Sequence, residues 1–74
     1  MADVTLDCRG LNCPIPIVKI SKSIKAMEKG QQLEVVATDP AFEADLQAWA
    51  KRLKHKVVAL NVESDSITAV IEKS

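Results

Sequence analysis

The segment CRGLNCPIP at residues 8–16 contains both cysteines of the chain, one of its two glycines and two of its three prolines. A cysteine is a nucleophile only as its thiolate, so its chemistry depends on how far the thiol pKa is lowered. Proline restricts the preceding residue to extended backbone, which a residue that caps a helix N-terminus also needs. The pattern therefore predicts that Cys13 caps a helix, with Pro14 at the first helical position.

In that position the sulfur of Cys13 would lie at the positive end of a helix dipole. Thiolates at helix N-termini have pKa values between about 3.5 and 7.5, against about 8.5 for free cysteine, and they attack soft electrophiles such as the outer sulfur of a persulfide. Pro14 and Pro16 have no N–H, so the Ile15 N–H is predicted to be the main backbone donor left for the sulfur. Passive filling of the cap position by cysteine stays open as an alternative.

Cys8 ends the first apolar segment and is interpreted as a strand residue that packs as a small hydrophobe. The alternative is a resolving thiol that forms a Cys8–Cys13 disulfide when a persulfide is discharged. Such a bond needs the two Cα atoms within about 7 Å, which the intervening loop permits. Gly10 in this loop is free to adopt a positive φ.

Basic residues lie near this loop, with Arg9 inside it and Lys19 and Lys22 on the helix that follows. They form either a docking surface for an acidic partner or an ordinary solvated helix face. Both interpretations are kept.

The elements that must position the loop are predicted by apolar periodicity. Strands are expected at 4–8, 32–38, 56–62 and 66–72, the second being largely covered because it is nearly continuous in apolar residues. Two helices are expected, and Asp39 should cap the second with Pro40 at its first position. Their buried stripes are predicted to be Ile17, Ile20, Ile24 and Met27 on the first helix, and Phe42, Leu46, Trp49, Ala50 and Leu53 on the second.

The order is therefore βαβαββ, which predicts a two-layer α/β sandwich. Right-handed crossovers place both helices on one face of a four-stranded mixed sheet, and the last two strands form an antiparallel hairpin. Residues 1–74 are expected to form a single domain. Its core should be thin, because a chain of this length buries only about 60% of the surface of its unfolded state.

Composition argues against several functional classes. Ten basic and ten acidic residues balance, unlike in a domain that binds nucleic-acid backbone. The chain opens without a signal peptide and has no apolar stretch of roughly 18 residues, so we expect a cytoplasmic protein outside the membrane. Two cysteines and one histidine cannot supply the four ligands of a structural zinc site, so no metal is expected.

The residues LD at 6–7, GL at 10–11 and CPIP at 13–16 together resemble the signature of the TusA/SirA-like sulfur-carrier family. The likeness continues through the first helix, through ATDP at 37–40 and to the closing hairpin. It thus covers nearly the whole chain.

The resemblance implies that Cys13 accepts a sulfane sulfur as a persulfide and passes it to an acceptor cysteine. Gly10, Pro14, Ile15 and Pro16 would support Cys13, and the two prolines are expected to fix the geometry of the sulfur more than they stabilise the fold. The pathway implied is tRNA thiolation, cofactor maturation or sulfur oxidation.

The implied donor is a cysteine desulfurase or a rhodanese, and the implied acceptor is a DsrE/TusD-like protein. No cofactor and no direct contact with nucleic acid are implied, and a monomer is expected. The protein would be a sulfurtransferase-like relay with a persulfide intermediate rather than a stand-alone enzyme.

Two alternatives from other classes stay open. Cys8 and Cys13 could form the oxidation switch of a thiol-redox regulatory module, or the domain could be an interaction module without chemistry. Substitution of Cys8 separates the first from a relay that needs one cysteine. A mass measurement after exposure to a sulfane donor separates the second.

Overall fold

A computed structural model gives the fold of the chain and describes residues 3–12 and 14–74, so the expectations about Cys13 itself lie outside the described residues. The elements follow in the order β1 (Val4–Cys8), α1 (Ile15–Ala26), β2 (Gln32–Ala37), α2 (Phe42–Leu53), β3 (Lys56–Val62) and β4 (Ile67–Glu72). The predicted βαβαββ order is confirmed. Within the ranges 3–12 and 14–74, no helix has the length and apolar character needed to cross a membrane.

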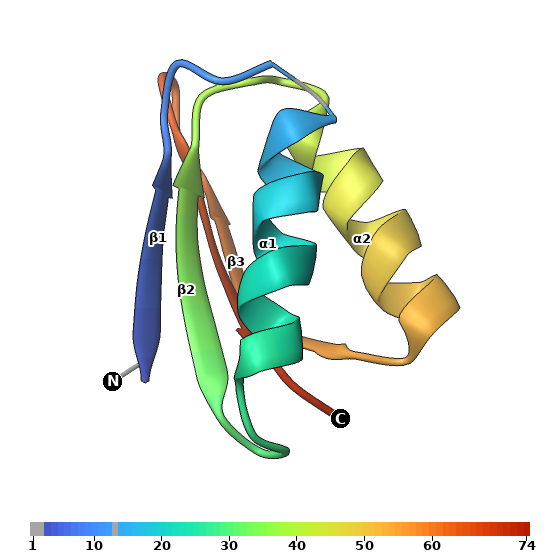
Figure 1. Cartoon of the computed structure of the whole chain (residues 1–74). Helices are drawn as coiled ribbons and strands as arrows, with labels where there is room; N and C mark the ends of the chain where they lie inside the picture. The colour runs from blue at the N-terminus through green and yellow to red at the C-terminus, as the bar shows by residue number, and fades with distance from the viewer. Residues whose placement is uncertain (1–2, 13) are drawn as a thin grey trace.

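The four strands form one mixed sheet in the order β1-β2-β4-β3. β1 runs parallel to β2, whereas β4 pairs antiparallel with β2 on one side and with β3 on the other. α1 makes the crossover between the two parallel strands. Figure 1 shows α1 and α2 together on one face of the sheet, which confirms the predicted two-layer sandwich.

The core lies between the sheet and the two helices. In β2 the buried residues Leu33, Val35 and Ala37 alternate with half-buried ones. β2 is therefore buried on one face only, and not largely covered as its apolar run predicted, because both helices lie on the same side of the sheet. The helices contribute Pro16, Ile20, Ile24, Phe42, Leu46, Trp49 and Ala50 to this core.

Two details of α2 differ from the prediction. Leu53 is 46% exposed rather than buried, because it is the last residue of the helix and Lys54 then turns the chain away in the left-handed conformation. The Asp39 carboxylate accepts a hydrogen bond from the Ala41 N–H (2.9 Å), as a capping residue does. The helix nevertheless begins only at Phe42, because the Phe42 N–H first closes a turn onto the Asp39 carbonyl (3.0 Å).

The carboxyl ends of β1 and β2 lie at the edge of the sheet where α1 and α2 begin, at the top of Figure 1. The connections that leave the two strands therefore come together at this edge. In sheets with parallel strands, binding sites form outside the carboxyl ends of the strands. The topology thus brings the CPIP segment to the end of the molecule where this fold offers a site.

Candidate functional site

The loop between β1 and α1 is held by hydrogen bonds to both strands beneath it. Gly10 has a φ of 80°, as predicted for this turn, and its N–H donates to the hydroxyl of Thr38 (2.9 Å). The Leu11 N–H donates to the carbonyl of Cys8 (3.3 Å). Because Thr38 directly follows β2, the contact with Gly10 ties the loop to the neighbouring strand, 28 residues away in the chain.

The start of α1 differs from the predicted cap. The helix begins at Ile15, and Pro14 rather than Cys13 is its N-cap residue. The Ile15 N–H donates to the carbonyl of Asn12 (2.9 Å) in a turn that precedes the helix. The prediction that this N–H is left for the cysteine sulfur is therefore wrong. The physical reason is that a helix leaves its first N–H groups without intrahelical partners, and a carbonyl three residues back satisfies this one.

The two prolines of the CPIP segment have opposite environments. Pro14 is exposed, and Ile15 beside it is 47% exposed. Pro16 is fully buried and packs in the core. Pro16 therefore stabilises the fold as well as stiffening the backbone, which corrects the expectation that both prolines act mainly on the sulfur.

Cys8 has no exposed surface, which supports its interpretation as a packed strand residue. Burial raises the pKa of its thiol, although the Lys19 ammonium acts in the opposite direction. A buried, protonated thiol is a poor nucleophile. For Cys8 to act as a resolving thiol, the carboxyl end of β1 would first have to open.

The raised pKa of Cys8 leads to a prediction about stability and pH. The unfolded chain ionises this thiol near pH 8.5, whereas the folded protein keeps it protonated. The unfolded state therefore releases its proton first as the pH rises, so the free energy of unfolding should fall above that pH. Comparing denaturant unfolding of Cys13→Ser with that of Cys8→Ala/Cys13→Ser from about pH 7 to about 10 measures the effect. The variant without Cys8 should have the flatter profile, and equal slopes would contradict the prediction.

The basic residues named from the sequence have different surroundings. The Arg9 guanidinium is held by the Asp7 carboxylate through two contacts of 2.9 Å, and this lowers the pKa of Asp7 to about 2. Lys19 acts on the thiol of Cys8 at the end of β1. Lys22, unlike Arg9 and Lys19, lines a hollow between α1 and α2. Arg9 is thus neutralised by its neighbour, whereas Lys19 and Lys22 are both exposed on α1.

A groove between the helices starts beside the CPIP segment. It consists of two adjoining hollows that share Pro14, Ile17, Trp49 and Arg52. We call this feature the helix groove. The groove therefore begins at the residue that follows Cys13 in the chain.

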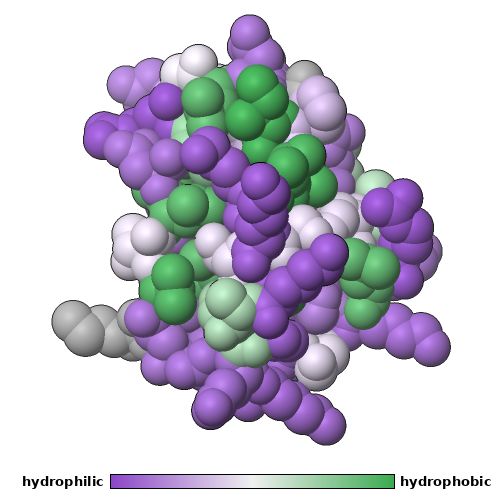
Figure 2. Space-filling model, viewed as in Figure 1, coloured by the Kyte–Doolittle hydropathy of each residue, from purple (hydrophilic) through white to green (hydrophobic). Residues whose placement is uncertain are grey.

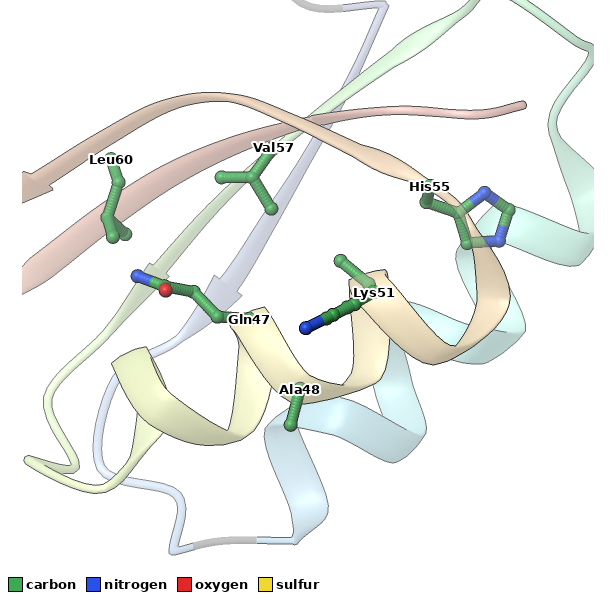
Figure 3. Close-up of a pocket in the computed structure, with 7 residues that line it drawn as sticks. Gln47, Ala48, Lys51, His55, Val57 and Leu60 are labelled. Carbon is green, nitrogen blue, oxygen red and sulfur yellow. The ribbon is translucent and has the colours of Figure 1, made fainter.

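A separate pocket lies between α2 and β3 (Figure 3). Gln47 and Lys51 of α2 line one side of it, Val57 and Leu60 of β3 line the other, and His55 stands at one end. The Nδ1 atom of His55 accepts a hydrogen bond from the Ser74 backbone N–H (3.2 Å). The lining of this pocket includes none of the described residues between β1 and α1, so His55 is not placed to act on the CPIP segment.

Thr38 is the site residue that the sequence interpretation did not single out. The ATDP stretch at 37–40 is part of the family resemblance and contains the predicted helix cap Asp39, but the sequence predicted no role for Thr38. The predicted topology could have indicated this role, because Thr38 follows β2, and β2 is parallel to β1, the strand that leads into the cysteine loop. Residues that follow neighbouring parallel strands lie at the same edge of the sheet.

We predict that Thr38 is a positioning residue for the loop. Thr38→Val removes the acceptor of the Gly10 N–H but keeps the size of the side chain, so the loop should loosen. Because this N–H is exposed and water can replace the hydroxyl, stability should change by less than about 1 kcal/mol. The sulfur loading of Cys13 that the family resemblance implies should fall roughly threefold to tenfold per folded molecule, since reacting groups must be held in place.

The matched control is Thr5→Val, because Thr5 is an exposed threonine on β1 away from the loop. Both variants are measured by denaturant unfolding and by the rate of loading from glutathione persulfide. Equal loading rates would show that the Thr38 hydroxyl does not position the loop.

Known proteins are similar to this chain over nearly its whole length. The protein-family model described as "Sulfurtransferase TusA" matches residues 4–73. The sulfur carrier protein TusA of Allochromatium vinosum is 40% identical over 72 residues, which are 97% of this chain and 95% of that protein. A protein of Aquifex aeolicus is 42% identical over 72 residues, and YrkF of Bacillus subtilis is 40% identical over the same length. The chain spans only 36% and 39% of the length of these last two.

Among solved structures, the chain is similar to a SirA-like protein of Desulfitobacterium hafniense. The TM-score is 0.81 with 24% sequence identity, and the match covers 93% of this chain and 95% of the other. At this level of identity the likeness shows the fold. It agrees with the four-stranded mixed sheet and two helices described above.

Proposed function

Since the chain belongs to the sulfurtransferase TusA family, we propose that it is a sulfur carrier that accepts a sulfane sulfur on Cys13 and passes it to a cysteine of an acceptor protein. The observation that carries this proposal is the place of the residues on either side of Cys13, 8–12 and 14–16, at the edge of the sheet where β1 and β2 end. The residues that follow Cys13 there, Pro14 and Ile15, are exposed. A partner protein can therefore approach this part of the surface.

The proposed loading step needs no other oxidant or reductant. The thiolate of Cys13 attacks the outer sulfur of a persulfide on the donor cysteine. A sulfur–sulfur bond forms to Cys13 while the sulfur–sulfur bond of the donor breaks, and the donor cysteine leaves as a thiolate. In delivery, a thiolate of the acceptor attacks the outer sulfur on Cys13, and Cys13 leaves as the thiolate that began the cycle.

The surroundings of the segment support a relay with one cysteine. Cys8 is buried and its thiol is kept protonated, so it is poorly placed to resolve a persulfide. The contact between Gly10 and Thr38 holds the loop that leads to Cys13. The thiol-redox alternative needs an accessible Cys8 and has less support from the structure.

The proposal names its partners by class. The donor is a cysteine desulfurase or a rhodanese, and the acceptor is a DsrE/TusD-like protein. The pathway it would serve is tRNA thiolation, cofactor maturation or sulfur oxidation. The relay would work in the cytoplasm, where the reducing conditions keep a thiol free between transfers.

Mass spectrometry of the loaded protein tests the proposal. The protein is incubated with a cysteine desulfurase and cysteine, or with a rhodanese and thiosulfate, and an unrelated cysteine protein is treated in the same way. The expected result is a gain of one sulfur atom that is lost on reduction and maps to the peptide containing Cys13. If neither donor adds sulfur to this peptide, the carrier function is wrong and the interaction module becomes the better account.

A further inference from the structure

We propose that the helix groove binds an acidic amphipathic helix of the donor protein that loads Cys13. This inference rests on the proposed function, because it names the part of the donor that brings its persulfide to the CPIP segment. The groove begins beside the residue that follows Cys13, so a helix bound in it would hold the donor close to this cysteine.

The lining of the groove follows the helical repeat on both of its walls. α1 contributes residues three or four positions apart, and α2 does the same. The lining residues are Pro14 at the N-cap of α1, Ile17, Val18, Ser21, Lys22 and Lys25 on α1, and Asp45, Ala48, Trp49 and Arg52 on α2. Two walls of this kind border a groove between the helices, and amphipathic helices are commonly bound in hydrophobic grooves.

Apolar side chains provide the surface that such a helix would bury. Val18 on α1 is 49% exposed, and Ile15 next to the start of the groove is 47% exposed. Ser21 and Ala48 are small and leave space between the walls. In Figure 2 hydrophobic side chains gather at the upper end of this face, where α1 begins, and long hydrophilic side chains extend below them. The apolar part of the groove therefore lies nearest to the CPIP segment.

The charge of the groove favours an acidic occupant. Lys22 and Lys25 stand on one wall and Arg52 stands on the other. No ion pair joins these three cations to an acid among residues 3–12 and 14–74. The acid that lines the groove, Asp45, comes early in α2 and therefore lies near Pro14. The partner helix should thus carry its carboxylates toward the far end of the groove and uncharged side chains near the cysteine.

The length of the groove suits a short helix. Lys25 follows Pro14 by eleven residues, and at 1.5 Å per residue this wall is about 16 Å long. A partner helix of about three turns would span it, with apolar side chains at every third or fourth position facing inward. Charge complementarity along such a length steers association and sets the orientation of the partner.

The experiment compares loading of Cys13 by a protein donor with loading by a small one. The groove variant is Lys22→Glu/Lys25→Glu/Arg52→Glu, and the donors are a cysteine desulfurase with cysteine, and glutathione persulfide. The matched control, Lys29→Glu/Lys51→Glu/Lys54→Glu, makes the same change in net charge at exposed residues that do not line the groove. Circular dichroism and denaturant unfolding verify that both proteins fold.

For the groove variant we expect kcat/KM for loading by the desulfurase to fall at least roughly tenfold at low ionic strength, and by a smaller factor at high salt. The control should stay within about twofold of the wild-type rate, because its charges lie outside the contact. Glutathione persulfide, a small anion, should load the groove variant and its control at equal rates. Ser21→Gln, which narrows the groove without changing its charge, should also slow loading by the desulfurase alone.

The possible outcomes separate the two proposals. Equal loading of the groove variant and its control by the desulfurase overturns the groove assignment and leaves the carrier function standing. Slower loading of the groove variant than of its control by glutathione persulfide also overturns it, because the effect would then lie at Cys13 and not in docking. If wild-type protein takes no sulfur from either donor, the carrier function itself is wrong, and the inference falls with it.

Discussion

Cys13→Ser is expected to lose sulfur loading completely, whereas Cys8→Ala should load at close to the wild-type rate. A serine hydroxyl is not ionised near neutral pH and cannot hold a sulfane sulfur, so no residual transfer is expected from the Cys13→Ser protein. Cys8 has no exposed surface, and removing its thiol leaves the exposed part of the site unchanged. Alanine is chosen at position 8 because a serine hydroxyl would be buried there without a partner.

The two variants are loaded by the same donor and compared by intact mass and by peptide mapping. Cys8→Ala removes a buried sulfur, so its stability should fall by on the order of 1 kcal/mol, and loading is therefore expressed per folded molecule. Sulfur on Cys13→Ser would show that another residue carries it. Loss of loading in Cys8→Ala would favour the thiol-redox alternative, in which both cysteines take part.

Pro16→Ala is expected to lower the free energy of unfolding by about 2 to 3 kcal/mol. The substitution removes two buried ring methylenes, each of which contributes about 0.8 kcal/mol. It also gives the unfolded chain more freedom, at a cost of about 0.4 to 1 kcal/mol. A domain of this length has a total stability of roughly 4 to 11 kcal/mol, so the loss would be a large fraction of it.

Pro14→Ala is the matched control, because the same ring is removed two residues earlier from an exposed position. Its stability should fall by no more than about 1 kcal/mol, since chain freedom is the main quantity that changes. Urea unfolding of the two variants and the wild type measures the difference. Equal losses for Pro14→Ala and Pro16→Ala would contradict the view that Pro16 stabilises the fold by burial.

Much of the fold could be predicted because local pattern and tertiary structure agree. The alternation in VTLDC predicted β1 over the same residues that form it, and the stripe through Ile20 and Ile24 predicted the buried face of α1. The run of Val35, Val36 and Ala37 was harder to interpret. An apolar run predicts a covered strand, but whether one or both faces are covered depends on where the helices pack.

The candidate site was harder to predict, because its contacts join residues that are distant in the sequence. The contact between Gly10 and Thr38 depends on the pairing of β1 with β2. The sequence predicted that the Ile15 N–H is left for the sulfur of Cys13, but the chain bends so that the Asn12 carbonyl accepts its hydrogen bond. The helix groove likewise exists only once α1 and α2 pack side by side.

The central claim is that Cys13 receives sulfur from one protein and gives it to another, and a single-turnover chase tests it most directly. The protein is loaded by a cysteine desulfurase with radiolabelled cysteine, separated from the donor, and mixed with a DsrE/TusD-like acceptor. We expect one labelled sulfur per molecule on the peptide containing Cys13, followed by its transfer to a cysteine of the acceptor and recovery of a free thiol that loads again. Label that never reaches Cys13, or that stays on Cys13 and leaves only on chemical reduction with every acceptor of this class, would contradict the account.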